Sequence, residues 1–173
     1  MLRGDPPPRL EDVARMVGAS RATLYYYFAG RDDLLAFLLT AHAEEGARVV
    51  QAALDPDSRP EQRLRAMLIA MAGYLGRRPG VCVGLLGALG ATGRMSEVLQ
   101  ANDIWIAGPL RELIIEAGAA GASTVRDAGT AADAILGALL LAVLGRSATG
   151  ADPADPEFGE SLAEQVLHGV LIS

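Results

Sequence analysis

Residues 10–35, LEDVARMVGASRATLYYYFAGRDDLL, contain the pattern that decides the fold. Two short helical stretches flank Gly18, which adopts a positive φ without strain and therefore suits a tight turn. Ala14 is small enough for two helices to cross closely, and Ser20 can cap the second helix by accepting a backbone N–H bond. Four apolar side chains can pack the two helices together: Val13, Val17, Leu24 and Phe28. This spacing predicts a helix-turn-helix, a motif whose second helix reads a groove of DNA in many proteins.

The rest of the chain also has a helical pattern, without the alternation that is typical of β-strands. Short breakers rich in Gly, Pro, Asp and Ser separate the apolar stretches. Pro109 should kink or divide one helix, because a proline inside a helix removes a hydrogen bond and clashes with the preceding turn. The predicted fold class is all-α, with helices at residues 10–17, 21–28, 32–53, 61–77, 82–91, 94–117, 126–147 and 157–171.

Composition narrows the kind of protein. Hydrophobic residues make up 51% of the 173 residues and aromatic residues only 5%, which indicates an aliphatic core. The single cysteine, Cys82, cannot form an internal disulfide, and with two scattered histidines it is too little for a metal site, so we expect no metal and no cofactor. The apolar runs at 81–90 and 134–145 fall short of the roughly 20 residues that a membrane span needs, and no signal peptide is recognisable. We therefore expect a cytoplasmic protein without membrane contact.

Charge is distributed unevenly along the chain. The net charge of −6 argues against non-specific binding to nucleic acid. The stretch from Arg9 to Arg31, however, contains four arginines and only two acids, Glu11 and Asp12. A small basic patch on an otherwise acidic protein is therefore possible. The second helix of the motif is about 10 Å long, which suits presenting one face to a major groove about 12 Å wide.

The segment from Ala14 to Leu35 resembles the TetR-type (TetR/AcrR) transcriptional regulators. The resemblance rests on the Gly-Ala-Ser turn and on the Thr-Leu-Tyr-Tyr-Tyr-Phe stretch, which runs into Arg-Asp-Asp-Leu-Leu at a fixed spacing. It implies that three side chains contact phosphates and that four residues face bases: Thr23, Tyr25 and Arg31 in the first group, and Ser20, Arg21, Ala22 and Tyr27 in the second.

The chain departs from that family at its start. Family members have a full helix before the helix-turn-helix, whereas only nine residues, three of them proline, precede Leu10. We therefore expect the DNA-binding head, residues 1–53, to lack its first helix and the natural gene product, or an ancestral one, to start about 20–40 residues earlier. Residues 54–173 are expected to form a regulatory and dimerisation body.

Within the body, the helix expected at 126–147 is apolar on every face, so we expect it and the helix at 157–171 to join two chains in a homodimer. The resemblance also implies a pocket for a small, apolar effector. Six residues are candidates for its lining, although their helical spacing fits an ordinary core equally well: Met67, Met71, Tyr74, Leu86, Trp105 and Ile106. For His42, on the apolar stripe of the 32–53 helix, a role in the pocket and simple packing both remain open.

Together these features predict a ligand-responsive repressor that binds operator DNA as a homodimer. Effector binding would move the 32–53 helix and separate the two heads. We expect no catalysis, because no Ser/His/Asp set, phosphate loop or carboxylate pair stands at motif spacing. The alternative is a helical small-molecule sensor or interaction protein that has lost DNA binding through truncation of the head.

Overall fold

The structure is a computed structural model that describes residues 10–89 and 95–168, and within these ranges it contains helices and no β-strand. The predicted all-α fold class is thereby confirmed. Expected helix ends at 91 and 171, and an expected start at 94, lie outside the described residues. The elements are α1 (Leu10–Met16), α2 (Arg21–Tyr27), α3 (Arg31–Ala53), α4 (Pro60–Gly76), α5 (Pro79–Leu89), α6 (Met95–Asn102), the π-helical turn η1 (Asp103–Ala107), α7 (Gly108–Ala119), α8 (Ala128–Ala148) and α9 (Pro156–Leu167).

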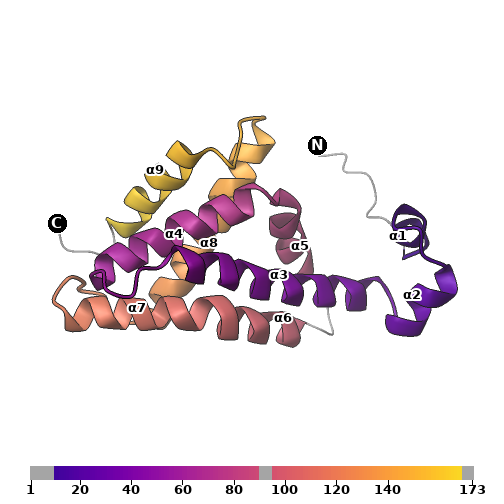
Figure 1. Cartoon of the computed structure of the whole chain (residues 1–173), viewed down its shortest axis with the longest axis horizontal. Helices are drawn as coiled ribbons and strands as arrows, with labels where there is room; N and C mark the ends of the chain where they lie inside the picture. Colours follow the sequence, from indigo (N-terminus) through magenta and orange to yellow (C-terminus); the bar gives the residue numbers. More distant parts are fainter. Residues whose placement is uncertain (1–9, 90–94, 169–173) are drawn as a thin grey trace.

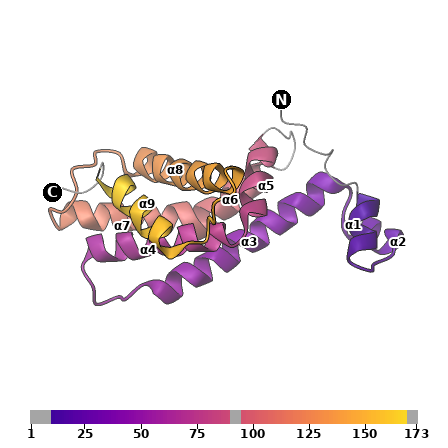
Figure 2. The ribbon, with the colours of Figure 1, turned by 90° about the horizontal axis from the view of Figure 1, so that it is seen from above.

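The long helix α3 connects a small head to a helical body (Figure 1). Helices α1 and α2 lie at its N-terminal end, away from the remaining helices, as Figure 2 shows from above. The rest of α3 packs against α4, α5 and α6. Residues 31–53 therefore belong to both parts, although the predicted division at residue 53 assigns them to the head alone.

Helix α4 is the centre of the body, with contacts to α3, α7, α8 and α9. Its apolar residues recur at helical spacing, so that one broad stripe faces these neighbours. The largest fully buried side chains come from α4, α5, α7 and α8: Leu64, Met67, Leu68, Cys82, Leu110, Ile114, Leu139 and Val143. Burying a side chain of this kind contributes about 1.5–3 kcal/mol, so this cluster is the main source of stability.

The helix expected at 94–117 is divided, as predicted, but the irregularity precedes Pro109. Residues 103–107 form a π-helical turn, in which the Gly108 N–H donates to the Asp103 carbonyl oxygen. A Cβ at Gly108 would lie 2.8 Å from that oxygen, so glycine permits the widened turn. Pro109 then stands in the first turn of α7, where its missing N–H costs little.

Helix α8 is more apolar than the run at 134–145 suggested. By length and composition alone it could cross a membrane, since an 18-residue window has a mean hydropathy of 1.8. Core helices of soluble proteins pass the same test. Only 22% of that window is buried within the described chain, and Leu141 is 62% exposed. Much of the apolar surface of α8 is therefore uncovered in a single chain.

Candidate functional site

The turn between α1 and α2 has the predicted geometry. Gly18 has a φ of 68°, and the Ala19 N–H donates to the Ala14 carbonyl at 3.0 Å. Ser20 is the N-cap of α2, and its Oγ accepts a bond from the Thr23 N–H at 3.0 Å. Ala14 is buried at the crossing. The structure thus confirms a helix-turn-helix built on Gly18 and Ser20.

The predicted packing of Val17 between the two helices of the motif is wrong. Val17 is 65% exposed and does not pack between the helices, because it lies in the turn beyond the last residue of α1. Leu10 is buried in addition to Ala14. Phe28 packs on Phe37 of α3, with ring centroids 5.5 Å apart, and so seats the motif on the start of the long helix.

The seven residues that the resemblance assigns to DNA are all exposed. They lie on α2, at its N-cap and at the start of α3: Ser20, Arg21, Ala22, Thr23, Tyr25, Tyr27 and Arg31. Arg31 opens α3, and the preceding Gly30 supplies no side-chain cap. Backbone N–H groups at such a helix start attract anions, and a guanidinium beside them can hold a phosphate in addition.

A carboxylate also reaches this surface. One oxygen of Glu11, on α1, accepts bonds from the Arg21 guanidinium and from the Tyr25 hydroxyl, each at 2.9 Å. The hydrogen bond to Glu11 raises the pKa of Tyr25. From the sequence, Glu11 counted only as a local negative charge, because helical periodicity does not show which side chains meet across a turn.

A cavity of about 320 Å³ lies in the body. Side chains of α3, α4, α5, α6, η1 and α8 line it, and most are aliphatic. Of the six candidate lining residues, Met71, Tyr74 and Ile106 are part of the wall. The other three lie outside it, because Met67 is packed in the core while Leu86 and Trp105 face solvent.

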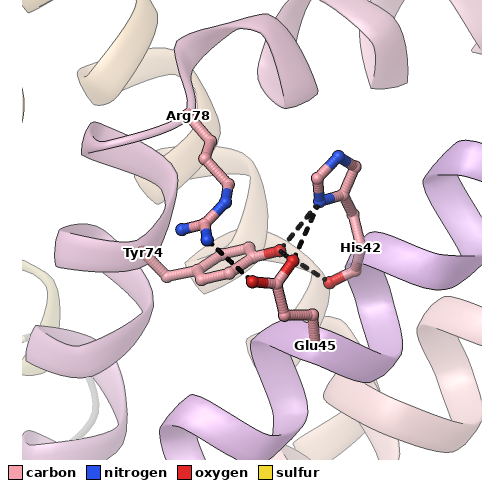
Figure 3. Close-up of polar contacts among 4 residues, drawn as sticks. All are labelled: His42, Glu45, Tyr74 and Arg78. Atoms are coloured by element: carbon pink, nitrogen blue, oxygen red, sulfur yellow. Dashed lines mark hydrogen bonds and ion pairs between the residues drawn. The ribbon is translucent and has the colours of Figure 1, made fainter.

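His42 lines the same cavity and belongs to a polar cluster with Glu45, Tyr74 and Arg78 (Figure 3). The Tyr74 hydroxyl lies 2.9 Å from His42 Nδ1, 3.1 Å from the His42 carbonyl and 3.1 Å from a Glu45 oxygen. The other Glu45 oxygen accepts from the Arg78 guanidinium at 2.7 Å. This guanidinium also lies over the Tyr74 ring, 4.5 Å from its centroid.

The cluster fastens α3 to the end of α4. Tyr74 is only 4% exposed, and burial together with the hydrogen bond to Glu45 raises its pKa to about 12. Its ring lies close to Gly46, where an added Cβ would stand 3.3 Å from the ring. Glu45 and Arg78 were not predicted. The spacing of His42 and Glu45, one turn apart on α3, was the available signal, but their partners lie elsewhere, Tyr74 on α4 and Arg78 in the connection to α5.

Comparisons with known proteins agree with this geometry. Residues 9–37 match the sequence model of the bacterial regulatory proteins of the tetR family. No curated protein matches the chain. Several solved structures share the fold, and three of them serve as examples of the similarity. The TetR family transcriptional regulator PfmR from Thermus thermophilus is 20% identical, with 92% of this chain and 87% of that chain covered and a TM-score of 0.70.

Two of these structures are described as regulators of fatty acid metabolism or as binding an acyl-CoA. The fatty acid degradation regulator FadR from Bacillus halodurans is 16% identical, covers 94% of this chain and 89% of that chain, and has a TM-score of 0.77. FadR from Bacillus subtilis, solved in complex with stearoyl-CoA, is 16% identical, with coverages of 94% and 88% and a TM-score of 0.75.

The helix-turn-helix matches the tetR-family sequence model, and the long connecting helix and helical body share the fold of these solved structures. The match at residues 9–37 and the shared fold confirm the resemblance to this family, by sequence in the head and by fold over the chain.

Proposed function

We propose that this chain is a ligand-responsive transcriptional repressor that binds operator DNA as a homodimer. The observation that carries the proposal is the double role of α3. This helix starts with Arg31 beside the exposed face of α2, and about three turns later it lines the cavity with His42. A molecule in the cavity therefore touches the same rigid element that positions the head.

On DNA, Thr23, Tyr25 and Arg31 would contact phosphates. Ser20, Arg21, Ala22 and Tyr27 would face the base edges. Arg31→Ala is expected to weaken binding to all sequences alike and to lower the slope of log K against log salt by about 1 per head. Arg21→Ala is expected to relax base preference as well, since arginine is the usual partner of guanine. Fluorescence anisotropy on a preferred and a scrambled duplex separates the two; equal sequence preference in Arg21→Ala and wild type would refute the base-reading role.

Dimerisation would proceed through α8 and α9. The uncovered apolar face of α8, which includes Leu141, needs a partner, and a two-fold pair of identical helices is the commonest way to supply one. A dimer would place two heads on one near-palindromic operator, whose half-sites are spaced by the distance between the heads.

The effector would act by preferring one separation of the heads over another. A ligand shifts such an equilibrium only by the difference in its affinity for the two states. The polar cluster around Tyr74 couples the cavity wall to α3, so a molecule that displaces Tyr74 or His42 changes the position of α3. This role requires no catalysis.

One observation favours the second candidate, a helical sensor without DNA binding. The Glu11 carboxylate neutralises Arg21 and occupies Tyr25 on the surface that would meet phosphates. A mobility-shift experiment with a salt titration distinguishes the two functions. Specific binding that weakens with salt supports the repressor, and its absence in a folded, dimeric protein supports the sensor.

A further inference from the structure

The wall of the cavity is almost entirely apolar. Aliphatic side chains from five helices and from η1 line it, among them Leu39, Val98, Ile106 and Leu140. At roughly 30 Å³ for a group the size of a water molecule, the volume of about 320 Å³ holds about ten non-hydrogen atoms. A ligand of this size with a linear or compact hydrocarbon body fits the cavity.

The titratable groups of the wall are the Asp133 carboxyl, on α8, and the side chains of His42 and Tyr74. Asp133 is exposed, and the Arg111 guanidinium interacts with it electrostatically. Among the residues that the structure describes, no arginine lines the cavity, and the sequence contains no lysine. Asn102 adds an amide, which can donate or accept a hydrogen bond.

The guanidinium groups nearest to the wall already have carboxylate partners. Arg78 donates to Glu45 at 2.7 Å behind Tyr74. Arg111 donates to Asp103 at 2.6 Å, and this bond lowers the pKa of the Asp103 carboxyl. Neither is free to pair with an acidic ligand without giving up an existing ion pair.

An anion in this cavity would lose its water without gaining a cation, which is costly for a carboxylate or phosphate. A cation would lose its water too, but the exposed Asp133 carboxylate, which Arg111 compensates through space without an ion pair, would offset part of this cost. The geometry points to a hydrophobic cation as the ligand, an alkyl or aryl body with one amine or quaternary ammonium group held near Asp133. This inference rests on the proposed function, because it takes the cavity as the effector site. It predicts a ligand whose charge is opposite to that of the stearoyl-CoA bound in the FadR structure from Bacillus subtilis.

Three probes with the same octyl chain, each of about the size that the cavity holds, test the inference on the full chain: octylammonium, octan-1-ol and octanoate, each below its solubility and micelle limits. Titration calorimetry at about pH 8 avoids protonation in the range where histidine ordinarily takes up a proton. The ammonium is expected to bind most tightly and octanoate at least tenfold more weakly than the alcohol. Equal or tighter binding of octanoate would overturn the proposal.

Two variants locate the preference. Asp133→Asn is expected to weaken binding of the ammonium about two- to fivefold, as for a partly solvated ion pair, and to leave binding of octan-1-ol unchanged. Glu160→Gln, at an exposed position on α9 and outside the wall, removes the same charge as a control and should change neither. If both variants behave alike, Asp133 does not select the cation and the proposal fails.

A third variant tests that the cavity is the place of binding. An added Cβ at Gly137, which lines the cavity, meets nothing within 4 Å, so a side chain can start there without strain, and the flexible methionine of Gly137→Met is chosen to occupy the space. It is expected to abolish binding of all three probes while sedimentation and circular dichroism stay unchanged. Retained binding in a folded Gly137→Met protein would contradict the site. These titrations contain no DNA, so a negative result would refute the proposed ligand without bearing on DNA binding by the head. A failure of DNA binding would likewise not affect the result of the ligand titrations.

Discussion

Replacing Tyr74 by phenylalanine removes one oxygen from the cluster that joins α3 to α4. The ring keeps its contacts with Gly46 and with the Arg78 guanidinium, so the change deletes hydrogen bonds and little packing. His42 Nδ1 loses its contact at 2.9 Å and keeps only the Glu45 oxygen at 3.5 Å, while Glu45 loses the Tyr74 hydroxyl and retains Arg78. Losing a hydrogen bond to a charged group costs about 1.5–3 kcal/mol. We expect Tyr74→Phe to lower the free energy of unfolding by this amount near pH 7.

The pH dependence gives the same substitution a second signature. The pKa of Tyr74 is about 12 in the folded chain, against about 10 in an unfolded one. A raised folded pKa contributes stability that is fully present below pH 10 and is lost as the pH rises to 12. At about 1.4 kcal/mol per pKa unit, the loss reaches up to ~3 kcal/mol. Burial also raises the pKa of Cys82, to about 11, but both proteins contain this thiol, so it cancels in their difference.

Urea unfolding at fixed protein concentration measures both effects, since a dimer would make stability depend on concentration. Tyr26→Phe is the matched control, because Tyr26 is 83% exposed and should change stability by less than about 0.5 kcal/mol. The gap between wild type and Tyr74→Phe should narrow between pH 10 and pH 12. A gap no larger than that of the control, or one that persists undiminished to pH 12, would refute the reasoning.

Three further substitutions probe other parts of the molecule. A Cβ at Gly76 would stand 2.0 Å from the Pro153 carbonyl oxygen, whereas a Cβ at Gly73 meets only the flexible end of Arg77. Gly76→Ala should therefore lower the free energy of unfolding by about 2 kcal/mol or more relative to Gly73→Ala. Equal melting temperatures of the two variants would contradict the close approach at Gly76. Glu11→Gln frees Arg21 and should tighten DNA binding about two- to fivefold by anisotropy, and weaker binding would show that Glu11 supports the reading surface. Leu141→Glu should yield monomers in sedimentation while Ile115→Glu, at 60% exposed on α7, should not, and a dimeric Leu141→Glu would place the interface elsewhere.

Local chemistry made the head predictable. A left-handed turn strongly favours glycine, and a helix start favours serine, so Gly18 and Ser20 define the helix-turn-helix without knowledge of the rest of the chain. Breakers rich in Gly and Pro likewise mark the helix boundaries. These features depend only on residues that are close together in the sequence, so they can be predicted from the sequence alone.

Contacts between distant segments were not predictable in the same way. Periodicity places Leu86 and Trp105 on apolar stretches, but it does not show that their side chains face solvent. The partners of Tyr74 follow from how α3 crosses α4, and the crossing depends on the close approach at Gly46. Asp133 reaches the cavity from an otherwise apolar helix, where hydropathy alone suggests only an interruption.

The central claim is that the exposed face of α2 and the start of α3 bind a specific DNA sequence. The most direct measurement is selection from random duplexes with the full 173-residue chain, followed by anisotropy titrations of the selected and a scrambled duplex at several salt concentrations. We predict enrichment of a near-palindromic site, a preference of at least about 10³-fold over the scrambled duplex, and an affinity that falls linearly in log K against log salt. A folded protein that enriches no site, or that binds both duplexes equally, would contradict the claim.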